Sequence, residues 1–249
     1  VLILTDINTE LLKTVVAEIT AAGGRVAFSD ALDVADHDAV TAFANAVHDE
    51  VGAMDIVMNV AGISTWGRIQ DLEHHHWRRT VEIDLMGPIH IMESFIPAMI
   101  DAGNGGHLVN VSSAAGLLGL PLHAPYSAAK FGLRGVSEVL RFDLERYGIG
   151  VTLVCPGGVD TPLVGTVEIV GIDRAHPKVQ RAMTAFQRHS VTPESAARAI
   201  IKGVKRKKYL VFTSPDIRLG FWAQRWFPPG YRFAMRKLNS RAQHLLDQL

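Results

Sequence analysis

Residues 112–130 read Ser-Ser-Ala-Ala-Gly-Leu-Leu-Gly-Leu-Pro-Leu-His-Ala-Pro-Tyr-Ser-Ala-Ala-Lys, and the other motifs of the chain can be placed around them. Tyr126 and Lys130 are four residues apart, and apolar residues recur at helical spacing after them. Both side chains are therefore expected on one face of a helix, with Pro125 in its first turn. An ammonium one turn away favours a phenolate and lowers the pKa of the phenol. The pair predicts a phenol that can exchange protons.

Ser113 follows the apolar strand pattern of residues 107–111. Its hydroxyl is expected to leave the carboxyl edge of a parallel sheet, which is where ligands collect in open α/β folds. A hydroxyl donor beside a phenol fits the polarisation and protonation of a carbonyl, or the reverse on an alcohol. A Tyr-x-x-x-Lys pair is common, however, and alone is weak evidence for catalysis.

Two further motifs flank this stretch. Asn59-Val60-Ala61-Gly62 precedes it and Pro156-Gly157-Gly158-Val159-Asp160-Thr161 follows it. With the serine and the Tyr-x-x-x-Lys pair, they make the chain resemble the short-chain dehydrogenase/reductase family over residues 1 to about 209. The resemblance implies an NAD(P)-dependent oxidoreductase that transfers a hydride between the nicotinamide and a secondary alcohol or ketone.

The resemblance also implies the roles of four catalytic residues. Tyr126 is the general acid and base, Ser113 holds the substrate oxygen, and Lys130 binds the nicotinamide ribose and lowers the pKa of the tyrosine. The family segment Val-Asn-Leu-x-Gly reads Ile83-Asp84-Leu85-Met86-Gly87 here, so an aspartate replaces the usual asparagine. The charge of Asp84 would favour the lysine cation and oppose ionisation of the tyrosine. We therefore expect an active enzyme with an altered pH optimum.

The cofactor is expected to be NAD. Asp6 ends the apolar run of residues 1–5, and an acidic residue at the end of the second strand of a dinucleotide fold can accept hydrogen bonds from the ribose hydroxyls. NADP stays open, because the Gly-rich loop of the family is not in the sequence. The other cofactor contacts that the resemblance implies are Asp33, Val34, Asn59, Ala61, Gly62, Tyr126, Lys130, Pro156, Gly157, Val159 and Thr161.

The fold class that the resemblance implies is α/β, a Rossmann-type doubly wound and mostly parallel sheet with helices on both faces. Residues 1–213 form this domain, and residues 214–249 form an apolar and basic extension packed on it. The family fold begins with a strand, a Gly-rich turn and a helix, none of which precedes Val1. We expect the parent protein to have an N-terminal segment whose strand lies between the strands that carry Asp6 and Asn59.

Composition narrows the class of protein. Lys and Arg equal Asp and Glu at 25 each, which argues against a nucleic-acid binder. The longest apolar runs are shorter than the roughly 20 residues that span a bilayer, and no signal-peptide pattern opens the chain. Cys155 is the only cysteine and is expected to be a buried, inert thiol. These features fit a cytoplasmic protein.

Several segments outside the motifs can also be interpreted. His74, His75 and His76 are consecutive and cannot share one helix face, so we expect no metal site. They begin a helix that runs towards Ile100. Residues 66–72 are expected to be a loop, and residues 162–189, which lack strong periodicity, correspond to the substrate-covering flap of the family.

The substrate is expected to be hydrophobic, from the polarity of the loop after Ser113 and of the C-terminal tail. The loop residues concerned are Ala114, Ala115, Leu117, Leu118 and Leu120. His123 either lines the pocket or lies on a surface loop. Two other functions stay open: a cofactor-binding regulatory protein without turnover, and a protein that contacts a membrane surface through its tail. The family resemblance further implies a homodimer or homotetramer.

Overall fold

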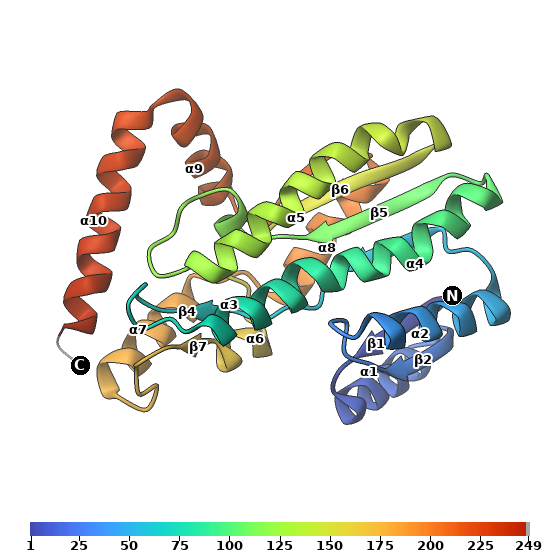
Figure 1. Ribbon diagram of the computed structural model, residues 1–249, viewed down its shortest axis with the longest axis horizontal. Helices are drawn as coiled ribbons and strands as arrows, with labels where there is room; N and C mark the ends of the chain where they lie inside the picture. The colour runs from blue at the N-terminus through green and yellow to red at the C-terminus, as the bar shows by residue number, and fades with distance from the viewer. Residues whose placement is uncertain (248–249) are drawn as a thin grey trace.

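The computed structural model describes residues 1–247 of the 249-residue chain (Figure 1). Its strands are β1 (Leu2–Asp6), β2 (Val26–Ala31), β3 (Ile56–Asn59), β4 (Thr65–Trp66), β5 (Gly106–Val111), β6 (Ile149–Cys155), β7 (Glu168–Ile169) and β8 (Leu210–Phe212). Its α-helices are α1 (Thr9–Ala21), α2 (His37–Val51), α3 (His74–Val81), α4 (Gly87–Ala102), α5 (Ala124–Asp143), α6 (Pro162–Thr166), α7 (Pro177–Arg188), α8 (Pro193–Lys205), α9 (Pro215–Trp226) and α10 (Pro228–Leu246). Three short turns complete the described part: η1 (Glu82–Met86), which is π-helical, and the 3₁₀ turns η2 (Ala114–Gly116) and η3 (Glu145–Tyr147).

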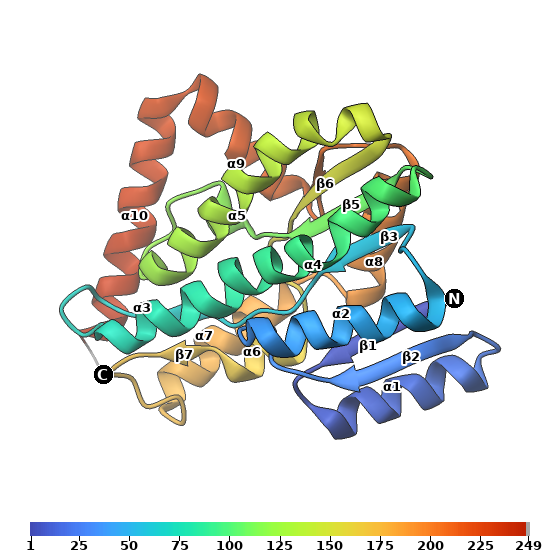
Figure 2. The same ribbon diagram turned by 45° about the vertical axis from the view of Figure 1, so that its right-hand side comes forward.

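All paired strands run parallel, as expected. The main sheet has the order β3-β5-β6-β8, with helices on both sides (Figures 1 and 2). The described strands form three separate groups, because β1 and β2 pair only with each other and β4 pairs with β7. A break falls between β1 and β3, where a further strand of the family fold is expected. Parallel strands in proteins are joined by crossovers, and here helices α1, α2, α4 and α5 supply them.

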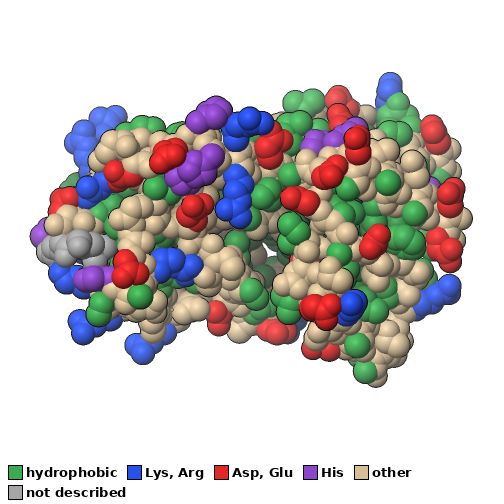
Figure 3. Space-filling view, turned by 60° about the horizontal axis from the view of Figure 1, so that its bottom comes forward, with side chains coloured by type: hydrophobic (Ala, Val, Ile, Leu, Met, Phe, Trp, Pro, Cys, Tyr) green, Lys and Arg blue, Asp and Glu red, His purple; other side chains and the backbone are tan. Residues whose placement is uncertain are grey.

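Apolar side chains are exposed on β1, in the β1-β2 pair, and on β3, at the edge of the main sheet. Leu2 of β1 is 45% exposed, and Ile56 and Met58 of β3 are 46% and 45% exposed. A hollow opens between the part that holds β1 and β2 and the rest of the molecule (Figure 3). No described strand hydrogen-bonds to both β1 and β3, and the strand expected between them stays a prediction.

The main hydrophobic core lies around α4. This helix packs against α2 and the main sheet, and its buried side chains include Phe95 and Met99, which are 5% and 1% exposed. Residues 74–102 are long and apolar enough to span a bilayer by length and composition alone. Half of that window is buried inside the protein, so we interpret it as a core helix rather than a membrane span.

Helix ends follow the sequence closely. Asn8 caps α1 by accepting a hydrogen bond from the Leu11 N–H, and Thr192 caps α8 by accepting one from the Ser195 N–H. The predicted loop of residues 66–72 is wrong at its start, because Trp66 belongs to β4. The flap of residues 162–189 is more ordered than its weak periodicity indicated, since it contains α6, β7 and α7.

The C-terminal residues form a helical hairpin of α9 and α10. One side packs on the body of the protein, where Ile217, Phe221 and Tyr231 contact a buried cluster that includes Leu117 and Leu118. The turn of the hairpin lies at the upper left of Figure 1, far from β1 and β2. The hairpin therefore covers the loop that leads to the catalytic helix.

Candidate active site

The site begins at the carboxyl ends of β5 and β6. Ser113 follows β5 in extended conformation and caps the turn η2, where its Oγ accepts a hydrogen bond from the Ala115 N–H at 3.1 Å. The preceding Ser112 is buried and donates to the Lys130 carbonyl at 3.0 Å. A side chain at Gly116 would collide with Ser112 Oγ and the Lys130 carbonyl, so glycine permits this close approach. The loop after β5 is thereby fixed against α5.

Helix α5 presents Tyr126 and Lys130 to the same site, as the sequence predicted. Tyr126 is 9% exposed and Lys130 is 4% exposed, and Pro125 stands in the first turn of the helix. The Lys130 ammonium lies 5.6 Å from the centroid of the tyrosine ring and donates to the Val111 carbonyl at 3.3 Å. The Ser113 side chain interacts with the tyrosine and lowers its pKa, so the three predicted residues lie together.

Burial raises the pKa of Tyr126 above that of a free phenol. The Lys130 cation and the hydrogen bond from Ser113 lower the pKa, but they offset only part of that effect, and the Asp84 carboxylate adds to the rise. The sequence correctly predicted that Lys130 lowers the pKa of Tyr126. The prediction that this pKa is lowered overall is wrong. Desolvation of a buried phenolate outweighs one nearby cation here.

Asp84 completes the site from the π-helical turn between α3 and α4. Such widened turns often occur at functional sites. Its side chain is fully buried: Oδ1 accepts from the Ile63 N–H at 2.8 Å and lies 3.7 Å from Lys130 Nζ. Oδ2 has no hydrogen-bond partner in the described part of the chain. Burial outweighs the attraction of the lysine and raises the pKa of Asp84 to about 6.

Gly62 makes room for this pair of charges. A Cβ atom at this position would lie 2.6 Å from Asp84 Oδ1 and 3.3 Å from Lys130 Nζ. The first distance is far below van der Waals contact, so only glycine allows the chain after β3 to pass here without displacing the carboxylate. Ala61, next to it, is exposed. The backbone at this position can therefore be approached closely by a ligand.

The acidic cofactor candidates lie at the ends of β1 and β2. Asp6 is the last residue of β1, is exposed, and accepts a hydrogen bond from the Asn8 N–H at 2.8 Å. Asp33 is exposed and accepts from the Ala35 N–H at 2.9 Å. The Val34 carbonyl is bound by the His90 ring at 3.0 Å, and its side chain packs against Gly87. These contacts fix the backbone and leave the Asp6 carboxylate accessible.

Asn59 is directed into the protein. Its amide donates to Asn110 Oδ1 at 2.8 Å, and Asn110 in turn donates to Ser137 at 2.9 Å. Asn59 is 7% exposed and Asn110 is fully buried. The side chain of Asn59 thus links β3, β5 and α5, and its expected contact with a cofactor stays a prediction.

The motif after β6 lies beside the flap and the hairpin. The Pro156 carbonyl accepts from the Ala114 N–H at 2.7 Å, which joins this motif to the loop of Ser113. Gly157 lies under Ile217 of α9. Val159 forms a parallel bridge with Val191, and Thr161 is the residue before α6. Their backbone groups lie at the same sheet edge as Ser113, as expected for residues that contact a cofactor.

The sequence left His123 either in the pocket or on a surface loop, and it gave Trp66 no role. The structure places His123 near Tyr126 and against Trp66. His123 stacks on Trp66 with ring centroids 4.3 Å apart, and its centroid lies 6.3 Å from that of Tyr126. Burial lowers the pKa of His123, which favours the neutral form of the ring. Trp66 is also held by a hydrogen bond to Ser64 at 2.7 Å. Trp66 and His123 are far apart in the sequence, so no local pattern predicts that they stack. Each residue precedes an expected helix, which is the only local signal.

The loop after Ser113 is only partly open, and the expected hydrophobic substrate stays a prediction. Leu120 borders a surface pocket together with Leu122 and Ala124, whereas Leu117 and Leu118 do not. Leu117 is fully buried and Leu118 is 6% exposed, and both pack against the C-terminal hairpin. They form a core with the tail and do not line an open pocket. Cys155 joins the same cluster, and burial raises the pKa of its thiol to about 12, as expected for an inert cysteine.

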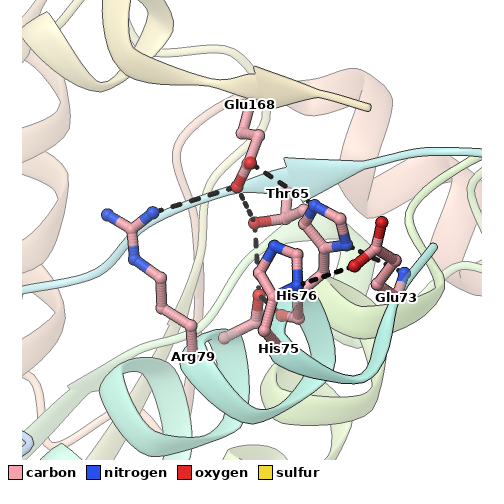
Figure 4. A network of polar contacts seen from close by, with 7 residues as sticks. Thr65, Glu73, His75, His76, Arg79 and Glu168 are labelled. Atoms are coloured by element: carbon pink, nitrogen blue, oxygen red, sulfur yellow. Dashed lines mark hydrogen bonds and ion pairs between the residues drawn. The ribbon is translucent and has the colours of Figure 1, made fainter. Parts of the chain in front are cut away.

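A polar network ties the flap to α3 (Figure 4). Glu168 of β7 lies 3.5 Å from His76 Nε2 and 3.9 Å from Arg79, and it accepts a hydrogen bond from Thr65 at 3.4 Å. His76 Nδ1 accepts from the Glu73 N–H at 2.9 Å at the start of α3. Among the described residues no group of three or more His, Cys, Asp or Glu side chains is placed to hold a metal ion.

The parallel sheet, with a serine, a tyrosine and a lysine at its carboxyl edge, defines a nicotinamide-type oxidoreductase. Comparison with protein families gives the particular family: residues 1–169 match the model described as short chain dehydrogenase, and the chain belongs to this family of NAD(P)-dependent oxidoreductases.

Several known proteins are similar to the chain. It is 34% identical over 239 residues to the probable oxidoreductase EphD of Mycobacterium tuberculosis, an alignment that covers 94% of this chain and 40% of EphD. It is 41% identical over 162 residues to trans-4-hydroxycyclohexanecarboxylate dehydrogenase of Sinomonas cyclohexanicum, covering 65% and 62% of the two chains. The crystal structure of a short-chain dehydrogenase/reductase from Burkholderia phymatum in complex with NAD superposes with a TM-score of 0.79 at 24% identity, over 90% and 84% of the two chains. The chain thus spans less than half the length of EphD.

Proposed function

We propose that this protein transfers a hydride between a nicotinamide cofactor and a secondary alcohol or ketone. The observation that carries the proposal is the convergence of Ser113 and Lys130 on the hydroxyl and ring of Tyr126. The bound nicotinamide supplies or accepts the hydride. Tyr126 takes the alcohol proton during oxidation and returns a proton to the carbonyl oxygen during reduction, while Ser113 holds that oxygen. Lys130 stabilises the ionised tyrosine and can bind a ribose hydroxyl.

The residues present fit a nicotinamide dinucleotide. The Asp6 carboxylate is exposed at the end of β1, where it can accept two ribose hydroxyls and would repel a 2′-phosphate. Gly62 and Ala61 allow close approach to the backbone beside the Lys130 ammonium. These features support NAD over NADP. The family resemblance implies cofactor contacts for Asp33, Val34, Pro156, Gly157, Val159 and Thr161. Their places after the carboxyl ends of β2 and β6 support this assignment.

We infer that the substrate is an apolar, cyclic secondary alcohol or the corresponding ketone. The stacked rings of Trp66 and His123 beside Tyr126 support this class, because flat apolar side chains favour a ring-shaped or hydrophobic ligand. The relative from Sinomonas cyclohexanicum is named for an alcohol on a cyclohexane ring. That compound is therefore the first substrate to test.

The test is a screen of cyclic secondary alcohols, beginning with trans-4-hydroxycyclohexanecarboxylate, with NAD and with NADP. Reduced cofactor is followed by absorbance, for the wild type and for Tyr126→Phe. We expect turnover with NAD and a decrease of roughly 10²–10⁴-fold in the variant, which is the usual size of a general acid–base contribution. Binding of NAD without turnover of any alcohol would instead favour a regulatory protein that keeps the fold and the cofactor.

A further inference from the structure

The C-terminal hairpin has one face that the rest of the protein does not cover. Its inner side packs on the body, and the Tyr231 hydroxyl accepts a hydrogen bond from the Gly119 N–H at 2.9 Å. The opposite side carries Leu219, Trp222 and Trp226 at positions that share one face of α9. They are 71%, 45% and 74% exposed.

The exposed face continues around the turn of the hairpin. Phe227 joins α9 to α10 and is 62% exposed, and Phe233 of α10 is 69% exposed. Trp226 is the last residue of α9, Phe227 follows it, and Phe233 lies in the second turn of α10, so all three are near the turn of the hairpin. This turn points away from the sheet (Figure 1). Several large exposed aromatic groups close together mark an interaction site rather than the scattered apolar residues of an ordinary surface.

Charge indicates the chemistry of the partner. Residues 214–249 contain six Lys and Arg against two Asp, a net charge of +4, so the remaining 213 residues carry the compensating −4 of a chain that is neutral as a whole. Asp247 is already paired with Arg68 at 2.6 Å. Within the described residues, none of the six cations forms an ion pair. The six are Arg218, Arg225, Arg232, Arg236, Lys237 and Arg241.

We propose that this aromatic and basic face of the hairpin binds the surface of an anionic lipid bilayer. Trp and Phe side chains insert at the depth of the headgroups, and Arg and Lys interact with lipid phosphates. A symmetric contact between the hairpins of two copies would instead place six cations against six cations, which is repulsive. An anionic lipid surface can bury the apolar groups of this face and neutralise its cations at the same time.

Two double variants test the proposal in the full-length protein. Trp226→Ser with Phe227→Ser removes the apolar part, and Arg218→Gln with Arg225→Gln removes two cations of α9. Controls of matched chemistry lie elsewhere on the surface: Phe142→Ser, which changes an exposed aromatic residue of α5, and Lys205→Gln with Arg206→Gln at the end of α8. Thermal unfolding checks that every variant is folded.

The measurement is co-sedimentation with phosphatidylcholine vesicles that contain or lack phosphatidylglycerol. We expect the wild type to bind only the anionic vesicles and to be released by high salt. Loss of two cations should weaken binding by about 30-fold, since each contributes roughly a factor of five near an anionic surface. The control variants should bind like the wild type.

Three results would overturn the proposal. The first is a wild-type protein that does not sediment with anionic vesicles at low salt. The second is an equal loss of binding in the control variants. The third is an oligomer in size-exclusion chromatography that dissociates in the Trp226→Ser and Phe227→Ser variant, because the face would then be a contact between subunits.

Discussion

Replacing Asp84 by asparagine should stabilise the protein at neutral pH, although the change breaks a buried ion pair. Removing one partner of such a pair usually destabilises a protein by about 3–5 kcal/mol. Here the pKa of about 6 already includes the attraction of Lys130, and it still lies above the ordinary value of 3.8. Ionising this carboxyl is therefore less favourable in the folded protein than in the unfolded chain.

The size of the stabilisation follows from the linkage between ionisation of Asp84 and folding. A carboxyl whose pKa is raised on folding contributes stability that is fully present below its unfolded pKa and is lost as pH rises through its folded pKa. For a change from 3.8 to about 6 the loss is about 3 kcal/mol above pH 7 and under about 1 kcal/mol near pH 4. The introduced amide is uncharged, like the protonated acid, and its oxygen can still accept from the Ile63 N–H. Asp84→Asn should avoid this loss.

The assay is urea unfolding of the wild type and Asp84→Asn between about pH 5 and pH 8. The variant is expected to be more stable, by an amount that grows to about 3 kcal/mol at the upper end. Asp101→Asn removes an exposed carboxylate from α4, the helix that follows the turn of Asp84, and should change stability by less than about 0.5 kcal/mol. A variant of Asp84 that is less stable than the wild type near pH 8, or a difference that does not vary with pH, would refute this reasoning.

Four further substitutions test the site and the core. Gly62→Ala should lower activity strongly, because the new Cβ would lie 2.6 Å from Asp84 Oδ1. Gly135→Ala, inside α5, places a Cβ with nothing within 4 Å and should stabilise the protein by about 0.5–1 kcal/mol. Activity assays and urea unfolding of both variants distinguish the two effects. Asp6→Ala should raise the KM for NAD by about tenfold and leave that for NADP nearly unchanged in steady-state kinetics, if the carboxylate binds the ribose. Leu133→Ala empties a fully buried position and should cost about 2–5 kcal/mol in urea unfolding without a change of cofactor preference.

The catalytic helix could be predicted from the sequence because its signals are local. The spacing of Tyr126 and Lys130 depends only on the helical repeat, and Pro125 marks the start of α5. The caps Asn8 and Thr192 are equally local, since each side chain bonds to a backbone N–H three residues later.

Other features depend on contacts between distant residues and left no local pattern. Strands β4 and β7 have two residues each, too few to show an alternation of apolar and polar positions. The bond of Thr65 to Glu168 joins positions 103 residues apart. The net direction of the Tyr126 pKa likewise depends on how deeply tertiary packing buries the phenol, which the four-residue spacing does not contain.

The pH dependence of both directions of the reaction should be linked, because the Lys130 cation interacts with two acidic groups, Tyr126 and Asp84. Lys130 lowers the pKa of Tyr126 and of Asp84, but an ionised Asp84 opposes ionisation of the tyrosine. In the proposed reaction the neutral phenol donates the proton in ketone reduction and the phenolate accepts it in alcohol oxidation, so both pH–rate profiles should report the same ionisation. In Asp84→Asn, the rising limb of the pH–rate profile for oxidation and the falling limb of the profile for reduction should therefore both move to lower pH. Equal shifts of kcat/KM for the two directions, measured in the same buffers, would support coupling between the carboxylate and the tyrosine. A shift in one direction only would assign that limb to a different group.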